Sequence, residues 1–424
     1  MSTFEVEVFQ NEYLPADGTE VNAIVTVSSA GVAGTGDAPD AAEIVIVDTS
    51  GSMDVPRAKM QAARDATAVA IDCIRDGVLF GLIAGNERAR QVYPSGRGLE
   101  PASEQSRAAA KQAVGKLKAG GGTAIGTWLR AANDAFAAAP GRVCHAILLT
   151  DGANQHETRE QLEATLAVCE GRFQCDCRGV GTDWEVSELR RIASVLLGSV
   201  DIIADPAEMA ADFRSMTEVA MGKTTGSVSL RIWTPQGARV QFVRQVAPTV
   251  EELTGRETVA KPLTADYPTG SWGEESRDYQ VCIEVPMHQV GDEMLAARVG
   301  LLHGEEVLSQ GLIKAIWTSD QQLSTQISRE VAHYTGQAEL AECIQEGLEA
   351  RKAGDNATAT FKLGRAVQLA AASGNDGTMK LLAAVVDVED PAAGTVRLRN
   401  EIADVDEMAL DTRSTRTVRV GPGA

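Results

Sequence analysis

Apolar residues follow two different spacings along the chain, and the change between them separates its regions. From residue 41 to residue 220, short continuous apolar runs alternate with longer stretches in which apolar residues recur every three or four positions. A continuous run is typical of a parallel strand covered on both faces, and the longer spacing is typical of an amphipathic helix. Their alternation predicts a doubly wound, Rossmann-like α/β domain with right-handed crossovers. The expected strands are 43–47, 78–83, 144–150, 173–180 and 200–203, and the expected helices are 56–76, 103–119, 127–138, 157–170, 187–197 and 206–219.

The segments on either side of this domain alternate apolar and polar residues with a period of two. Such alternation predicts half-buried strands, and turn residues separate the short strands of residues 226–320, so this region is expected to form a β-sandwich. Residues 1–40 contain two further alternating stretches and end in a linker at 31–40 that is rich in Gly, Ala, Pro and Asp. We expect these N-terminal strands to complete the sandwich, which makes the α/β domain (41–220) an insertion into it.

The C-terminal part of the chain has a third pattern. Residues 321–388 contain three or four amphipathic segments with helical spacing, which predict a small α-helical module. Residues 389–424 are polar, rich in hydroxyl groups and locally basic, which predicts a mobile tail.

Composition and charge narrow the classes of function. A chain of 424 residues is long enough for two to four domains, and its apolar content of 44% is sufficient for packed cores. The net charge of −20 argues against nucleic acid and anionic membrane surfaces as partners, because both require basic patches. No apolar run reaches the length of about 18 residues that spans a bilayer, so no membrane insertion is expected. The N-terminus has no apolar signal core and the seven cysteines are scattered, which favours a cytoplasmic protein.

Polar residues at the ends of two expected strands carry the candidate chemistry. Asp48, Ser50 and Ser52 directly follow the first strand of the α/β domain. Thr123 comes after three glycines, and Asp151 follows the third strand. In an open α/β sheet, ligands bind beyond the carboxyl ends of the strands, so these side chains are expected to meet there. Carboxylate and hydroxyl oxygens are ligands that Mg²⁺ prefers, and the sequence therefore predicts a metal site.

The balance of charge in this set indicates what the site would do. Three of its five donors are neutral hydroxyls, so a bound divalent ion would stay electrophilic and favour an acidic oxygen from outside. An Asp or Glu side chain or a phosphate of a partner would fit. A catalytic metal site would also need a general base beside the open position, and no such grouping has local support. The sequence thus predicts no catalytic residues.

The sequence also predicts no loop that would bind a nucleotide or another organic cofactor. Gly222-Lys223-Thr224 is similar to the end of a phosphate-binding loop, but Thr217 stands where that loop needs its first glycine. We therefore expect no organic cofactor.

These segments resemble the von Willebrand factor A domain and its metal-ion-dependent adhesion site (MIDAS), whose pattern is Asp-x-Ser-x-Ser, then Thr, then Asp. The matching positions here are Asp48, Ser50, Ser52, Thr123 and Asp151. The resemblance covers about residues 41–217 and includes the segments 119–126, 149–152 and 179–183. One departure is Ala84-Gly85, where the family often has Phe; this affects packing more than metal binding. The resemblance implies bound Mg²⁺ or Mn²⁺ and an interaction function.

Four more residues lie close to these segments in the sequence. Asp54 and Asp183 either border the site or are solvated surface residues. His156 either approaches the site or is an ordinary residue of a loop or helix start, whereas His145, inside an expected strand, is expected in the core.

We expect a metal-dependent interaction or scaffold protein that binds an acidic group of a protein partner through Mg²⁺. Intracellular bacterial members of the family resemble parts of signalling and metal-stress systems, which suggests bacterial signalling or a stress response. One alternative is a non-catalytic subunit of a chelatase or ATPase machine, which would require a separate ATPase. Another is a metal-dependent phosphohydrolase, which would require a base that the sequence does not supply.

The expected tail suggests a second partner. Thr412, Thr415 and Thr417 lie beside arginines, and phosphorylation there would add negative charge and acceptor oxygens. A phosphothreonine-binding protein could then recognise the tail; the alternative is a disordered end without this role.

Overall fold

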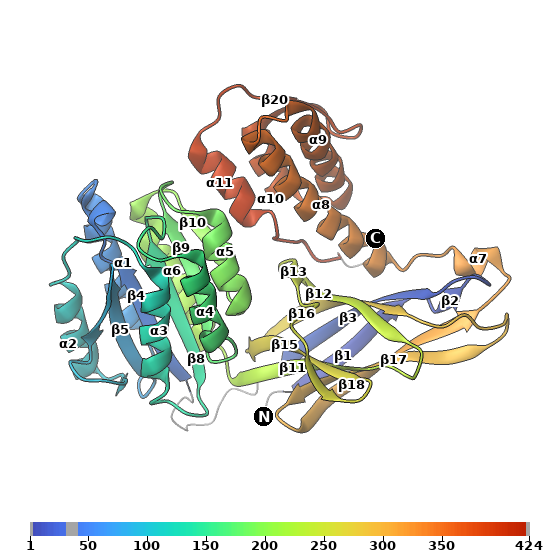
Figure 1. Ribbon diagram of the computed structural model, residues 1–424, viewed down its shortest axis with the longest axis horizontal. Helices are drawn as coiled ribbons and strands as arrows, with labels where there is room; N and C mark the ends of the chain where they lie inside the picture. The colour runs from blue at the N-terminus through green and yellow to red at the C-terminus, as the bar shows by residue number, and fades with distance from the viewer. Residues whose placement is uncertain (1–2, 31–40, 421–424) are drawn as a thin grey trace. The chain divides into compact units, whose positions relative to one another are not determined.

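The computed structural model describes residues 3–30 and 41–420, so the linker expected at 31–40 lies outside the described residues. The chain forms two compact units. One comprises Ala33–Ser227 and Gly270–Gly273, and the other comprises Met1–Val32, Val228–Thr269 and Glu274–Ala424. The first unit is thus inserted into the sequence of the second (Figure 1).

The inserted unit is built on a seven-stranded sheet of order β10-β9-β8-β4-β5-β6, with β7 also paired to β5. The strands from β10 to β5 run parallel, and β6 and β7 are antiparallel to β5. Every residue of β4 is buried, because helices cover both faces of the sheet. The strands are β4 (Ala41–Asp48), β5 (Leu79–Gly85), β6 (Ala89–Tyr93), β7 (Glu100–Pro101), β8 (Val143–Thr150), β9 (Gln174–Val180) and β10 (Val200–Ile203).

Helices cover the two faces of this sheet in separate groups. On one face, α1, α2 and α6 pack with alternate residues of β4 and β8, including Val45, Val47 and Ile147. On the other face, α3 packs beside α4, and α5 lies against β9. The doubly wound α/β fold expected from the sequence is confirmed. The helices are α1 (Ala58–Cys73), α2 (Glu104–Val114), α3 (Ile125–Phe136), α4 (Arg159–Cys169), α5 (Val186–Val195) and α6 (Met209–Met221), with 3₁₀ turns η1 (Gly51–Asp54) and η2 (Pro206–Glu208).

The second unit contains the expected β-sandwich. Its sheets have the orders β1-β3-β16-β12-β13 and β14-β15-β11-β17-β18-β2. The N-terminal strands pair with each other, and β3 also pairs with β16, so the beginning of the chain lies in the same sheet as residues far along it. The strands are β1 (Thr3–Gln10), β2 (Tyr13–Leu14), β3 (Glu20–Ala30), β11 (Thr225–Trp233), β12 (Arg239–Ala247), β13 (Glu251–Glu252), β14 (Thr258–Lys261), β15 (Thr264–Trp272), β16 (Glu275–Glu284), β17 (Glu293–His303) and β18 (Glu306–Trp317).

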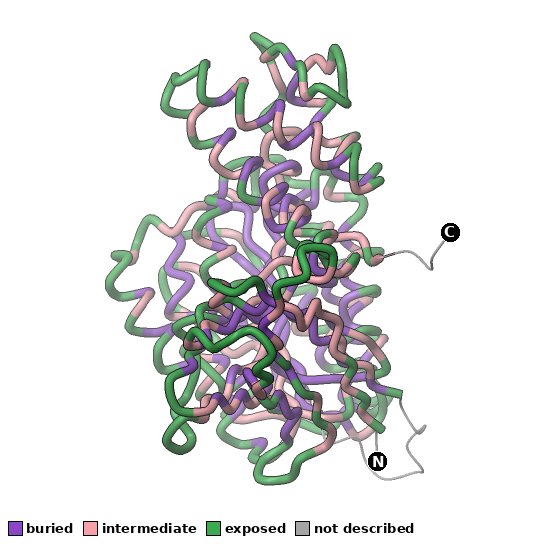
Figure 2. The backbone as a smooth tube through the Cα atoms, turned by 90° about the vertical axis from the view of Figure 1, so that its right-hand side faces the viewer, coloured by how far each residue is buried: buried purple, intermediate pink, exposed green. Residues whose placement is uncertain are grey.

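The helical module is joined to the sandwich through its longest helix. The first half of α8 contributes Val331 and Tyr334 to a core with residues of β3 and β12, and its second half packs against α9. Buried residues are common within the strands and helices, and many of the connecting turns are exposed (Figure 2). The elements are α7 (Gln321–Ser324), α8 (Arg329–Lys352), α9 (Asn356–Ser373), α10 (Asp376–Val385), a hairpin of β19 (Val386–Asp390) and β20 (Thr395–Leu398), and α11 (Asp404–Arg413).

The C-terminal segment differs from the mobile tail that the sequence suggests. Most of residues 389–413 belong to β19, β20 and α11. Beyond α11, the N–H of Val250 donates to the Thr415 carbonyl (2.7 Å), and the N–H of Thr417 donates to the Pro248 carbonyl (3.0 Å). A ring nitrogen of His333 lies 2.7 Å from the Val418 carbonyl oxygen. Main-chain hydrogen bonds therefore tie residues 415–418 to α8 and the sandwich, where the sequence predicted a mobile tail.

Candidate metal centre

Asp48 ends β4 at the carboxyl edge of the parallel sheet, and its side chain is fully buried. The N–H of Ser50 donates to its Oδ1 (2.6 Å), and the hydroxyl of Thr150, the last residue of β8, donates to its Oδ2 (2.6 Å). These bonds fix the orientation of the carboxylate without supplying a positive charge. Burial raises the pKa of Asp48 to about 6, against the hydrogen bonds from Ser50 and Thr150 that act to lower it. A cation beside Asp48 would remove this penalty on the charged carboxylate.

Asp151, the residue after β8, lies in the same place and is also fully buried. The hydroxyl of Ser52 donates to its Oδ1 (2.6 Å), and the ammonium of Lys59 donates to its Oδ2 (2.8 Å). The Ser52 hydroxyl is also 2.9 Å from that of Ser50. Hydrogen bonds therefore join four of the predicted residues in one network. Asp48 accepts the Ser50 N–H, the Ser50 and Ser52 hydroxyls bond to each other, and Ser52 donates to Asp151.

Thr123 is brought to this network by the glycine-rich loop. The N–H of Gly51 donates to the Gly121 carbonyl (2.9 Å), and the N–H of Gly120 donates to the Thr49 carbonyl (2.8 Å). This pair of bonds ties the loop to the turn that carries Ser50 and Ser52. Gly121 has a φ of 87°, a left-handed conformation that favours glycine. The loop thus needs glycine for its backbone as well as for close approach.

His156 holds the main chain of Thr123 through two hydrogen bonds. Its main-chain N–H donates to the Thr123 carbonyl (2.9 Å), and its Nδ1 accepts the N–H of Thr123 (3.2 Å). A Cβ on Gly122 would lie 1.9 Å from the His156 ring, so this position requires glycine. Of the two alternatives that the sequence leaves open, the structure supports the approach to the site, with His156 as a residue that positions the loop.

Packing also explains why this chain has Ala84-Gly85 where the family often has Phe. A Cβ on Gly85 would lie 2.3 Å from the indole ring of Trp128. The fully buried Trp128 donates its ring N–H to the Asn86 carbonyl (2.7 Å), which also accepts the N–H of Ala124 (3.1 Å). A tryptophan of α3 therefore occupies the space that a large residue at position 85 would fill, and it steadies the start of α3 beside Thr123.

We call Asp48, Ser50, Ser52, Thr123 and Asp151 the hydroxyl cluster. A Cβ placed on Gly152 would lie 3.3 Å from the Ser52 hydroxyl oxygen and 3.5 Å from that of Thr123. Glycine at this position therefore keeps open a space between two hydroxyls of the cluster. Two buried carboxylates and three hydroxyls are a donor set that fits a hard divalent cation. Within the described residues, no group of three or more His, Cys, Asp or Glu side chains could hold a metal, so the hydroxyls are essential to this fit.

Lys59 is the residue of this site that sequence reasoning missed. It lies in the first turn of α1, with a side chain only 9% exposed, and its ammonium reaches Asp151. A signal was present in the spacing, because Lys59 shares a helical face with the buried residues Ala63, Ala66 and Ala70. A lysine on the apolar face of a helix needs a buried partner.

The other predicted residues are placed as follows. Asp54 is exposed in η1. Asp183 is 74% exposed, with its Oδ2 3.8 Å from the Lys59 ammonium. In the C-terminal segment, Thr412 is buried and donates its hydroxyl to the Met408 carbonyl (2.8 Å), and the Thr417 hydroxyl donates to the Val246 carbonyl (2.7 Å). A kinase could reach these two hydroxyls only after the segment opened, and Thr415 is half-buried beside them.

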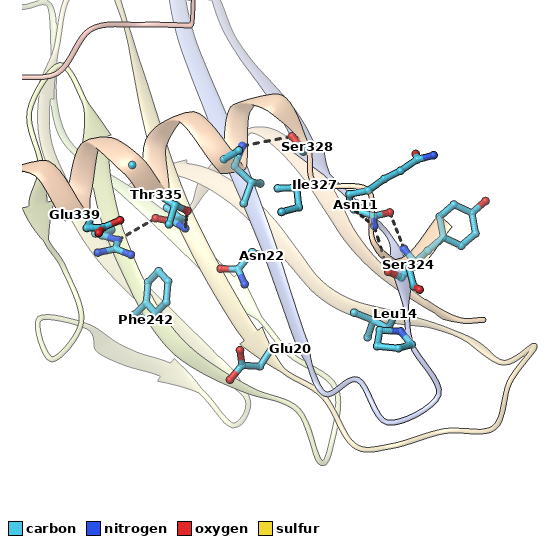
Figure 3. A pocket seen from close by; sticks show the side chains of 18 residues that line it. Asn11, Leu14, Glu20, Asn22, Phe242, Ser324, Ile327, Ser328, Thr335 and Glu339 are labelled. Atoms are coloured by element: carbon cyan, nitrogen blue, oxygen red, sulfur yellow. Dashed lines mark hydrogen bonds between the residues drawn. The ribbon is translucent and has the colours of Figure 1, made fainter. Parts of the chain in front are cut away.

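A separate groove of about 690 Å³ lies between α8 and the five-stranded sheet of the sandwich (Figure 3). Its polar side chains largely bond to their neighbours: Asn11 donates to the carbonyls of Leu323 and Gln326, and Gln280 donates to the Thr335 hydroxyl. These bonds link α8 and the segment before it to the sandwich.

Comparisons with known proteins agree with this fold. Residues 42–202 match the von Willebrand factor type A domain, and residues 368–414 match the von Willebrand factor type A C-terminal domain. A solved structure described as von Willebrand factor type A from Catenulispora acidiphila is 50% identical, covers 99% of this chain and 97% of its own, and superposes with a TM-score of 0.95. The chain belongs to the von Willebrand factor type A family.

Two more distant matches are a solved structure with the same fold and a curated relative that matches in sequence. The ArnB paralog VWA2 from Sulfolobus acidocaldarius is 14% identical, and the match covers 98% of each chain with a TM-score of 0.60. An uncharacterised protein of Synechocystis is 30% identical over 216 residues, which are 50% of this chain and 49% of that protein. The chain therefore spans about half the length of this curated relative. Within residues 3–30 and 41–420, no helix combines the length and apolar character that crossing a membrane would require.

Proposed function

We propose that this protein binds an acidic group of a protein partner through a divalent metal ion held by the hydroxyl cluster. The observation that carries the proposal is the meeting of two buried carboxylates, Asp48 and Asp151, with serine hydroxyls at the carboxyl edge of the sheet. The fold supports it, because von Willebrand factor type A domains are protein-interaction modules.

Each residue of the cluster has a distinct part in this proposal. Asp48 and Asp151 would supply negative charge to Mg²⁺ or Mn²⁺, and Ser50, Ser52 and Thr123 would supply neutral oxygens. A mainly neutral donor set leaves the ion able to attract a further anionic oxygen. The ion would act as a Lewis acid towards an Asp, Glu or phosphate oxygen of the partner, and the chain's own residues would hold and orient the site.

Affinity capture with and without Mg²⁺ tests this function. Wild-type protein should retain a partner in Mg²⁺ and lose it with a chelator, and Asp48→Ala should lose it in both conditions while keeping the wild-type circular dichroism spectrum. Asp54→Ala is the matched control, because Asp54 is exposed in the same turn and lies outside the cluster. A partner that is captured equally by Asp48→Ala and in chelator would disprove the proposal.

A further inference from the structure

The hydroxyl cluster has a built-in cation, and its position suggests a role in selecting the partner. Lys59 Nζ lies 2.8 Å from Asp151 Oδ2, and both side chains are buried. The opposite oxygen of Asp151 accepts the Ser52 hydroxyl at 2.6 Å. Lys59 therefore pairs with the side of Asp151 that faces away from the serines, while the serine side of the carboxylate faces the proposed ion.

The charge of the complete site follows from these contacts. Asp48 and Asp151 contribute two negative charges, Lys59 contributes one positive charge, and a divalent ion contributes two. The occupied site would then carry a net charge of +1. The other acidic neighbour of Lys59, Asp183, is 74% exposed, so water screens its charge. Without Lys59, the same site would be neutral.

We propose that Lys59 is a specificity-determining residue, which weakens the hold on the metal ion and makes an anionic oxygen from the partner necessary to balance the site. This inference rests on the proposed function and deepens it. A positive charge close to the ion repels it, and the same charge attracts an anion that approaches the ion. Lys59 therefore has opposite effects on the two binding steps.

Opposite effects are a signature that a purely structural lysine would not produce. In Lys59→Met, which keeps the length of the apolar stem, Mn²⁺ alone should bind roughly tenfold more tightly. The concentration of acetate or inorganic phosphate needed to displace water from the bound Mn²⁺ should rise by a similar factor. A lysine that only held the fold together would weaken both steps when removed.

The test uses the full chain with Mn²⁺ as the probe. Electron paramagnetic resonance of unbound Mn²⁺ gives the metal affinity, and proton relaxation of water on bound Mn²⁺, with added acetate or phosphate, gives the anion affinity. Lys59→Arg should behave as wild type because it keeps the charge. Lys111→Met is the matched control, since Lys111 forms an exposed ion pair with Asp72 on the same unit at 2.6 Å. Acetate and phosphate as separate arms distinguish a carboxylate partner from a phosphorylated one.

The possible outcomes separate this inference from the proposed function. Absence of Mn²⁺ binding to wild type would overturn the metal site and this inference with it. Normal wild-type binding, with Lys59→Met unchanged or weaker for Mn²⁺, would overturn only the role of Lys59. If Lys59→Met is unfolded by circular dichroism, Lys59→Gln takes its place, and failure of both to fold while Lys59→Arg folds would show a structural role and overturn the inference.

Discussion

The strands β4 and β8 carry a cluster of buried polar residues at each end, and the two clusters handle charge in different ways. At the amino ends, His145 lies between two carboxylates: its Nδ1 is 2.9 Å from Glu43 Oε1, and its Nε2 is 3.0 Å from Asp176 Oδ2. We call these three residues the histidine cluster. At the carboxyl ends, the hydroxyl cluster holds Asp48 with one N–H and one O–H and no cation.

The pKa values record this difference. Burial acts to lower the pKa of His145, but the charge of Glu43 and the hydrogen bond to Asp176 raise it to about 10. Burial likewise acts to raise the pKa of Asp176, but the hydrogen bond and charge of His145 hold it below its ordinary range. For Asp48 the effect of burial prevails, and its pKa is raised to about 6. Asp176 is thus stabilised by the cation His145, whereas Asp48 has no cation beside it, since Lys59 in the hydroxyl cluster pairs with Asp151.

The two ends of this sheet differ in whether the chain itself supplies a cation for a buried carboxylate. In the histidine cluster, His145 offsets part of the cost of burying two carboxylates from within the chain: it holds down the pKa of Asp176, whereas burial still raises that of Glu43. In the hydroxyl cluster, Asp48 carries a cost of burial that an external cation would relieve. Binding sites are often places where a fold keeps such a cost, which other parts of the structure offset.

The largest expected effect on stability comes from replacing His145, the cation of the histidine cluster. His145→Leu leaves Glu43 buried without its cation, while Asp176 keeps its hydrogen bonds from Ser199, and we expect the inserted unit to be destabilised by about 3–5 kcal/mol. Hydrogen exchange of peptides that cover β4 and β8 measures this change locally. His288→Leu is the control, because His288 is a half-exposed histidine 3.6 Å from Asp292 in the other unit. Wild-type protection in His145→Leu would contradict the account of the histidine cluster.

The second effect is a loss of stability at alkaline pH. A histidine whose pKa is raised in the folded state stabilises the fold fully below its unfolded pKa of about 6.5, and this contribution is lost as pH rises through the folded value of about 10. We expect a loss on the order of 3 kcal/mol between pH 7 and pH 11. Urea unfolding followed by exchange in β8 should show it in wild type, and the wild-type and His145→Leu curves should converge above pH 10. Parallel curves would mean that His145 is neutral.

The third prediction concerns Asp48, at the other end of β4, where a substitution should raise the stability of the metal-free protein instead of lowering it. The raised pKa of Asp48 means that its charged form is disfavoured by folding, so Asp48→Asn should stabilise the metal-free protein by about 2 kcal/mol. Thermal unfolding in chelator measures this gain. The same variant should lose the increase in melting temperature that Mn²⁺ gives to wild type. A lower melting temperature in chelator would show that Asp48 is needed for the fold itself.

The fold and the main residues of the site were accessible from the sequence for a clear reason. Continuous apolar runs such as 44–47 indicate buried parallel strands, and the residue after such a run lies at the carboxyl edge of the sheet. The contact between Ser52 and Asp151 follows from that rule. Strand β6 was missed because its polar, alternating residues lie near the edge of the sheet, where the apolar pattern is weak.

Other features depend on partners that no local pattern reveals. His145 was expected in the core, but its carboxylates come from β4 and β9, which are distant in the sequence. The polar C-terminal segment predicted mobility, yet its Thr417 hydroxyl bonds to a carbonyl of β12. Lys59 is similar, since its ion pair with Asp151 joins residues 92 positions apart. Polarity indicates exposure only where no such partner exists in the fold.

The smallest expected effect is on the Mn²⁺ affinity when Asp183, which lies just outside the hydroxyl cluster, is replaced. Asp183 contacts Lys59 at 3.8 Å, but its side chain is 74% exposed, so water and salt screen the pair. Asp183→Asn should therefore change the Mn²⁺ affinity by less than about twofold, whereas Asp48→Asn should abolish binding. Mn²⁺ titration of both variants at low and physiological salt measures the contrast. A tenfold change for Asp183→Asn would place this carboxylate within the metal site, and the separation between a buried binding cluster and its solvated surroundings would then have to be drawn farther out.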